Sequence, residues 1–187
     1  MGTFTYLKTL IKDRNVASIT PSSSFTVKKA TRNIDFSRDI VIVEYGPGTG
    51  VFSEYLLKKM TAGSRLIMIE LNKEFCDILH GIEDERVSVY NESAENIHEI
   101  LENEGLAEVD YFLSGIPFSF LPEMVKDTIL SRSASLLNPE GYFLAYQTSK
   151  HLKKPLKRHF KHVKTEFELR NLPPMCIYEA NGKKQQV

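Results

Sequence analysis

The chain has 187 residues, of which 42% are hydrophobic and 26% are charged. This size and composition predict a single globular domain with a full hydrophobic core. Lysine and arginine together number 24, as do aspartate and glutamate, so no overall charge draws the chain to nucleic acid or to a membrane. With two cysteines and no apolar run of about 18 residues, the sequence predicts neither a disulfide framework nor a membrane span.

The charges are distributed unevenly along the chain. Between residues 70 and 110 there are thirteen acidic residues against Lys73 and Arg86, whereas residues 150–164 contain seven lysines and arginines, three histidines and no acid. This distribution predicts one acidic and one basic side.

The first 24 residues are predicted to form a separate N-terminal segment. Phe4, Leu7, Leu10 and Ile11 lie at helical spacing, which predicts an amphipathic, basic helix over residues 3–14. Such a helix covers the site as a lid, lies in a membrane interface or packs on the core. A serine-rich loop follows, and one of its serines is expected to cap a helix over residues 25–33.

The strongest motif follows the first predicted strand. Residues 40–43 are a short β-branched apolar run, which indicates a buried strand, and residues 51–60 have helical periodicity. Between them the stretch EYGPGTG, residues 44–50, places three glycines at alternate positions. Glycine lets the backbone take positive φ and approach a ligand closely. Strand, glycine-rich turn and helix form the opening of a nucleotide-type α/β site.

Two details of this loop select the ligand. A dinucleotide fingerprint needs its third glycine at position 51, but this chain has Val51 there and Gly50 one place earlier. Glu44, at the end of the strand, would repel a pyrophosphate but suits a ligand that carries an amino group. The alternative is an ordinary βα turn without a ligand.

A second acid stands where a nucleotide site needs one. The apolar strand predicted over residues 65–69 ends at Glu70, which lies 20 positions after Gly50. A carboxylate there can accept hydrogen bonds from both hydroxyls of a ribose. Taken alone, Glu70 could be a surface acid, but its spacing from the glycine loop favours the ribose role.

The rest of the chain continues the alternation of helices and strands. The predicted fold is α/β, with a seven-stranded mixed sheet and helices on both faces. Residues 25–180 form the predicted domain and residues 181–187 a disordered tail. The alternation of residues 163–169 predicts an antiparallel member of the sheet. The remaining elements are helices over 72–79, 121–137 and 155–160, and strands over 86–90, 109–113, 142–147 and 175–180.

A second motif, SGIPFSF at residues 114–120, follows the fourth predicted strand. Ligands of such sheets bind outside the carboxyl ends of the strands, so this loop is expected beside the glycine loop. Ser114 and Phe118 are the candidates for contact with a substrate. Core packing is the alternative for Phe118.

The pattern E-x-G-x-G-x-G resembles motif I of the class I S-adenosylmethionine (SAM) methyltransferases, which have a Rossmann-like fold. The resemblance implies SAM as the cofactor. Ser93 and Ala94, after the third strand, are expected at the adenine edge, although Ser93 could simply cap a helix. The implied cofactor-binding residues are Glu44, Tyr45, Gly46, Gly48, Thr49, Gly50, Glu70, Leu71, Ser93, Ala94 and Ser114.

Within that class the chain resembles the bacterial phospholipid N-methyltransferases. The segments that carry the resemblance are PSS at 21–23, EYGPGTG at 44–50, SGIPFS at 114–119 and NLPP at 171–174. The resemblance implies methylation of phosphatidylethanolamine towards phosphatidylcholine and an N-terminal helix that binds an anionic membrane surface. We therefore expect a cytoplasmic, peripherally membrane-associated protein, in which Cys76 and Cys176 are buried thiols.

The alternative is an RNA adenine N6-methyltransferase, because the rRNA adenine dimethyltransferases have a very similar glycine loop. Their fourth-strand motif is N-L-P-Y or N-P-P-Y, in which the first residue accepts from the exocyclic amine and the aromatic stacks on a flipped base. Here Ser114, a weaker acceptor, stands at the first position, and their C-terminal helical domain is missing. A SAM-binding protein without catalysis is a second alternative.

Methyl transfer to an amine needs the nitrogen lone pair aligned with the S–CH₃ bond and water excluded. Ser114, a main-chain carbonyl or a tyrosine could orient the amine, and the sequence identifies no base. Aromatic faces stabilise a quaternary ammonium product by roughly 0.5–2 kcal/mol. Phe118 and Tyr45 are the expected aromatic residues.

Overall fold

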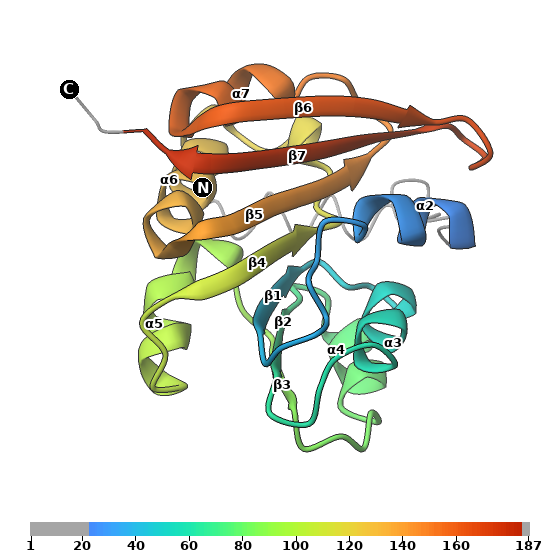
Figure 1. Ribbon diagram of the computed structural model, residues 1–187, viewed down its shortest axis with the longest axis vertical. Helices are drawn as coiled ribbons and strands as arrows, with labels where there is room; N and C mark the ends of the chain where they lie inside the picture. Colours follow the sequence, from blue (N-terminus) through green and yellow to red (C-terminus); the bar gives the residue numbers. More distant parts are fainter. Residues whose placement is uncertain (1–22, 185–187) are drawn as a thin grey trace.

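The computed structural model describes residues 23–184 (Figure 1). One seven-stranded sheet runs through this part of the chain in the order β3-β2-β1-β4-β5-β7-β6. Strands β1 to β5 are parallel where they pair, and β7 runs antiparallel to both β5 and β6. The strands are β1 (Val41–Tyr45), β2 (Arg65–Ile69), β3 (Val87–Tyr90), β4 (Val109–Ser114), β5 (Leu137–Gln147), β6 (Phe160–Glu168) and β7 (Met175–Lys183). The predicted α/β class and seven-stranded mixed sheet are confirmed.

Helices cover both faces of the sheet. On one face lie α2 (Ser24–Ala30), α3 (Val51–Leu57) and α4 (Lys73–Leu79), and on the other α5 (Ile97–Asn103), α6 (Glu123–Leu136) and α7 (Lys153–His159). Two short 3₁₀ turns, η1 (Ala94–Asn96) and η2 (Phe118–Phe120), complete the described elements. Since β1, β2 and β4 have helices on both sides, their side chains are buried in both directions, which explains their continuous apolar runs.

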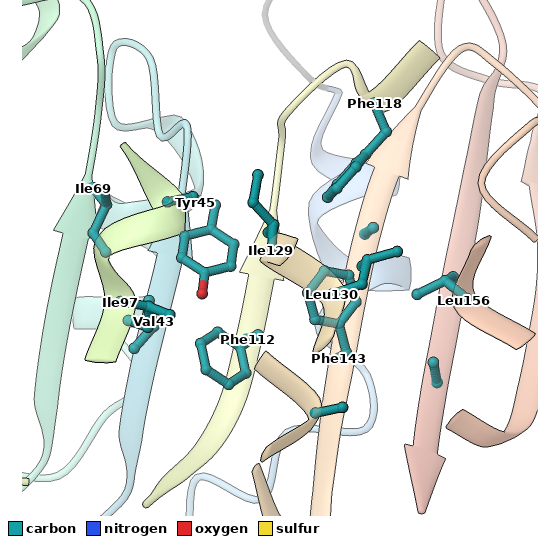
Figure 2. Packing of buried hydrophobic residues seen from close by; sticks show 14 of the residues in the cluster. Val43, Tyr45, Ile69, Ile97, Phe112, Phe118, Ile129, Leu130, Phe143 and Leu156 are labelled. Atoms are coloured by element: carbon teal, nitrogen blue, oxygen red, sulfur yellow. The ribbon is translucent and has the colours of Figure 1, made fainter. Parts of the chain in front are cut away.

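The larger core lies between the sheet and α5 to α7. Figure 2 shows it from close by, with the Tyr45, Phe112 and Phe143 rings in one layer. Ring centroids of Tyr45 and Phe112 are 5.4 Å apart, and those of Phe112 and Phe143 are 6.2 Å apart. Cys76 and Cys176 are buried free thiols, as expected.

The strand register brings the two sequence motifs to one edge of the sheet. Tyr45, the last residue of β1, pairs with Ile69 at the end of β2 and with Ser114 at the end of β4. Ser114 in turn pairs with Ala145 near the end of β5. The glycine loop, Glu70 and residues 114–120 therefore all follow the carboxyl ends of neighbouring parallel strands.

The C-terminal part confirms one expectation and corrects another. Residues 163–168 lie in β6, which pairs antiparallel with β7, its neighbour at the edge of the sheet. The predicted disordered tail begins too early, because β7 continues to Lys183, which pairs with Phe160. The polar side chains of this end lie on a half-exposed strand, which their composition does not distinguish from a tail.

The expected helix over residues 3–14 and most of the serine-rich loop lie outside the described residues. The cap expected for the following helix is Ser23, whose hydroxyl accepts from the Thr26 N–H. Within residues 23–184 no helix is long and apolar enough to cross a bilayer.

Candidate functional site

The glycine loop turns sharply at the carboxyl end of β1. Gly46, Gly48 and Gly50 all have positive φ, of 64°, 60° and 86°. A β-carbon at position 46 would also lie 3.3 Å from the Ile116 side chain, and one at position 50 would lie 3.2 Å from Leu79. The backbone conformation therefore favours glycine at all three positions, and close packing adds to this preference at positions 46 and 50.

Glu44 is a fully buried carboxylate at the base of this loop. Its Oε2 accepts from the Ser53 hydroxyl at 2.6 Å, whereas Oε1 is buried and has no hydrogen-bond partner within the described part of the chain. Burial, with a smaller contribution from the charge of the nearby Glu70, raises the pKa of Glu44 to about 7, and the hydrogen bond from Ser53 opposes this shift. A buried acceptor without a partner is costly, so the site favours a ligand that brings a positively charged donor.

Glu70 joins the glycine loop to the end of β2. Its Oε2 accepts from the Gly48 N–H at 3.1 Å, and its Oε1 accepts from the Asn72 N–H at 2.9 Å. Burial raises its pKa, and these two backbone bonds oppose that shift. Each carboxylate oxygen can accept a second hydrogen bond, so Glu70 can hold the loop and still accept from a ribose.

Hydrogen bonds also join the end of β3 to the residues that follow β2. The Asn91 side-chain amide donates to the carbonyl oxygens of Glu70 and Leu71 at 2.9 and 3.1 Å. Ser93 caps η1, since its hydroxyl oxygen accepts from the Glu95 N–H at 3.2 Å. Capping does not conflict with a main-chain contact to adenine at Ala94, which stays a prediction.

Comparisons with known proteins identify the fold. No family model matches the chain. It is 27% identical over 173 residues to an ornithine lipid N-methyltransferase of Singulisphaera acidiphila, a match that covers 91% of this chain and 90% of that protein.

Two solved structures are similar over nearly the whole chain. One is the Burkholderia thailandensis 1,6-didemethyltoxoflavin-N1-methyltransferase with bound S-adenosylhomocysteine, with a TM-score of 0.68, 18% identity and coverage of 97% of this chain and 87% of that one. The other is the magnesium protoporphyrin IX methyltransferase of Synechocystis PCC 6803 with bound SAM, with a TM-score of 0.68, 11% identity and coverage of 96% and 97%. This is the class I methyltransferase fold.

The expected enzyme class and cofactor agree with these proteins, whose names all give a methyltransferase and two of which were solved with SAM or its product. The relatives give no support to a link with the rRNA adenine dimethyltransferases. Glu44, with its unpartnered oxygen, fits the ammonium of SAM, and Glu70, at the end of the next strand, fits its ribose.

Tyr45 and Phe118 do not line the methyltransferase site with their rings. The Tyr45 side chain is buried in the core, where its hydroxyl lies 3.1 Å from that of Ser133 on α6. Phe118 is also buried and meets the edge of the Phe143 ring at 6.4 Å between centroids (Figure 2). The expectation that these rings face a methylated ammonium is corrected, because alternation along β1 and the apolar space under η2 direct both rings into the core.

Ser114 closes β4 and organises the turn after it. Its side chain is fully buried, and its hydroxyl oxygen accepts from the Ile116 N–H at 3.3 Å. Gly115 then donates its N–H to the Tyr45 carbonyl at 2.9 Å, which joins the second loop to the first. Thr49 is exposed, and Gly46 and Leu71 are half-buried, so these three remain open to a ligand.

Sequence reasoning missed Tyr146 on β5. Its ring stacks on Phe52 of α3, with 4.0 Å between centroids, and a β-carbon at position 115 would lie 2.5 Å from its hydroxyl. The same position lies 2.9 Å from the Gly46 carbonyl, so the Tyr146 hydroxyl stands where the two loops meet. Burial and the charges of Glu44 and Glu70 raise its pKa well above the usual value, so it stays protonated.

Gln147, the next residue, fixes the second loop. Its Oε1 accepts from the Phe118 N–H at 3.2 Å, and its side-chain amide donates to the Ser149 carbonyl at 2.9 Å. In the sequence, a tyrosine and a glutamine at the end of an apolar strand could have indicated these two site residues, since ligands bind beyond the carboxyl ends of such strands.

Proposed function

We propose that the protein is a SAM-dependent N-methyltransferase that acts on the amine headgroup of a membrane lipid. The observation that carries this proposal is the match to a lipid N-methyltransferase along 91% of this chain and 90% of that relative. The carboxyl edge supports it with two buried carboxylates beside a glycine loop, which suit the ammonium and the ribose of SAM.

We propose phosphatidylethanolamine as the acceptor, because the segments at 21–23, 44–50, 114–119 and 171–174 resemble the phospholipid N-methyltransferases. Ornithine lipid is the second candidate, and the 27% identical relative favours it. Both headgroups offer a primary amine, so the same arrangement of residues serves either lipid.

When bound, SAM would supply a methyl group from its sulfonium and leave as S-adenosylhomocysteine. Glu44 and Glu70 would hold it at its ammonium and its ribose, beside the glycine loop. Tyr146, neutral at physiological pH, orients the amine by a hydrogen bond through its hydroxyl. The headgroup ammonium first loses a proton to solvent, because only the free amine has the lone pair that bonds to the methyl carbon as the carbon–sulfur bond breaks.

Labelled SAM tests this proposal. We would incubate the protein with liposomes that contain phosphatidylethanolamine, ornithine lipid or phosphatidylcholine alone, and in parallel with ribosomal RNA. We expect label in a liposome with a free amine, none in phosphatidylcholine and none in RNA. Label in RNA, or in no fraction, would overturn the proposal, and the preferred amine lipid decides between the two acceptors.

A further inference from the structure

Large apolar side chains gather at the end of the sheet where β6 turns into β7. Leu169 and Leu172 in this hairpin are 75% and 81% exposed, and Phe167 and Phe25 beside it are 45% and 46% exposed. Single exposed apolar residues are ordinary, but a group of them marks an interaction site. We call these four residues the tip surface.

Hydrogen bonds and a cation–π contact hold α2 against the β6–β7 hairpin at the tip surface. The Asn171 side-chain oxygen accepts from the Ser23 N–H at 2.8 Å and from the Thr26 hydroxyl at 3.0 Å, which fixes α2 against the hairpin. The guanidinium of Arg170 lies 4.1 Å from the centre of the Phe25 ring. The apolar side chains are therefore presented from a supported turn.

This hairpin lies on the ligand side of the sheet. Gln147 at the end of β5 pairs with Cys176 at the start of β7, so residues 169–174 come before that point and extend past the carboxyl ends of the parallel strands (Figure 1). The glycine loop and residues 114–120 follow those same ends. A partner that binds the tip surface would therefore also face the proposed cofactor site.

The charges around the tip surface favour anionic lipid. Its three nearby carboxylates, Glu166, Glu168 and Glu179, are all in ion pairs. Arginine and lysine partners hold the pKa of Glu166 and Glu168 well below the usual range, so these pairs persist at physiological pH. Two further cations, Lys28 on α2 and Lys150 after β5, are exposed and make no ion pair with another described residue.

Most of the basic stretch 150–164 lies away from the tip surface. After Lys150 it follows α7 back to the start of β6, which lies at the edge of the sheet away from the ligand side. There Arg158 pairs with Glu123, and His159 lies 2.8 Å from Asp127, both on α6. Lys150, the first residue of the stretch, reaches the tip surface, where its Nζ lies 5.1 Å from the centre of the Phe167 ring, and Lys164, the last, pairs with Glu166.

We infer that the tip surface inserts into the headgroup region of an anionic lipid bilayer and so sets the carboxyl edge of the sheet against the membrane. This inference rests on the proposed function, because an enzyme for a lipid amine must bring its site to that surface. The leucines enter the apolar boundary, while Lys28 and Lys150 meet lipid phosphates. The first described residue, Ser23, is held to Asn171 in this hairpin.

The chain has no tryptophan, so one introduced indole reports on its own position. Leu172→Trp places it at the tip surface, and Ile78→Trp is the matched control, since Ile78 is 53% exposed on α4 near the opposite end of the strand order. We expect vesicles with anionic lipid to shift the emission of Leu172→Trp to the blue, and high salt to weaken that shift. The Ile78→Trp emission should not move. No shift for Leu172→Trp, or an equal shift for both variants, would overturn the inference.

A double variant separates docking from catalysis. In Leu169→Ser/Leu172→Ser we expect vesicle binding to fall by about tenfold for each leucine, while methylation of a short-chain, water-soluble acceptor stays at the wild-type rate. A blue shift of Leu172→Trp that depends on protein concentration without vesicles would assign the tip surface to a second copy of the chain and overturn the inference. A protein that docks but methylates no amine would overturn the proposed function instead.

Discussion

The Gly48 N–H donates to the Glu70 carboxylate over 3.1 Å and so joins the glycine loop to the end of the neighbouring strand. The two residues are separated by 22 positions in the chain, but the parallel register of β1 and β2 brings their strand ends together. The residue proposed to bind the ribose therefore also shapes the loop proposed to surround the cofactor.

This bond predicts a graded effect of substitutions at Glu70. Glu70→Ala removes the loop acceptor and the ribose acceptor together, so SAM affinity should fall by at least about a hundredfold, since each bond to a charged group contributes roughly 1.5–3 kcal/mol. Glu70→Gln keeps one acceptor oxygen and should lose less. Calorimetric titration with SAM measures both, and unchanged affinity in the folded Ala variant would contradict the role.

Gly48→Val gives an independent test of the loop. Valine is a β-branched residue that tolerates a φ of about 60° poorly, so the loop must change conformation and the bond to Glu70 is lost. We expect SAM binding to become undetectable while the far-ultraviolet circular dichroism of the folded sheet is kept. Val51→Ala on the following helix is the control and should bind SAM as wild type does.

The pKa of Glu44 predicts how SAM affinity depends on pH. Because burial raises this pKa to about 7, the free protein holds a neutral Glu44 below pH 7 and a carboxylate above it. The ammonium of SAM favours the carboxylate, so affinity should rise as pH increases towards 7 and level off above it, with proton release on binding. Titrations across this range should show the rise in wild type and a flat profile in Glu44→Gln. The same slope in both proteins would assign the dependence to another group.

Tyr146→Phe should lower methyl transfer by roughly five- to tenfold, the value of one hydrogen bond of about 1 kcal/mol. The ring and its stacking on Phe52 are kept, so the melting temperature and the SAM affinity should stay close to wild type. Turnover with saturating SAM is the measurement. Equal turnover in Tyr146→Phe and wild type would show that the Tyr146 hydroxyl has no role in methyl transfer.

Phe118→Ala should destabilise the protein instead of selectively slowing catalysis. The ring is buried between η2 and β5, and removing such a ring costs about 3–5 kcal/mol of folding free energy. Denaturant unfolding measures this loss. If Phe118→Ala had wild-type stability and low turnover, the Phe118 ring would contact the methyl acceptor and this prediction would be wrong.

The comparison of Glu70 with Tyr45 shows what the sequence could and could not predict. Spacing along the chain was sufficient to place Glu70 beside the glycine loop, because strand–loop–helix units of this kind have nearly fixed length. The direction of Tyr45 depends on which face of β1 meets α6, and a strand buried on both faces carries no polarity signal for this. The role of the Tyr146 hydroxyl could not be predicted from the sequence, because this hydroxyl reaches the two loops only through the pairing of β5 with β4.

The most direct test of the proposed lipid methylation offers the protein all the acceptors that a cell contains. We would express wild type and Glu70→Ala in bacteria that make phosphatidylethanolamine but no phosphatidylcholine, and analyse lipids and ribosomal RNA by mass spectrometry. We expect methylated amine lipids with wild type, none with Glu70→Ala, and unchanged RNA in both. Unmodified lipids together with new N6-methyladenine in the RNA of the wild-type cells would contradict the proposed lipid methylation.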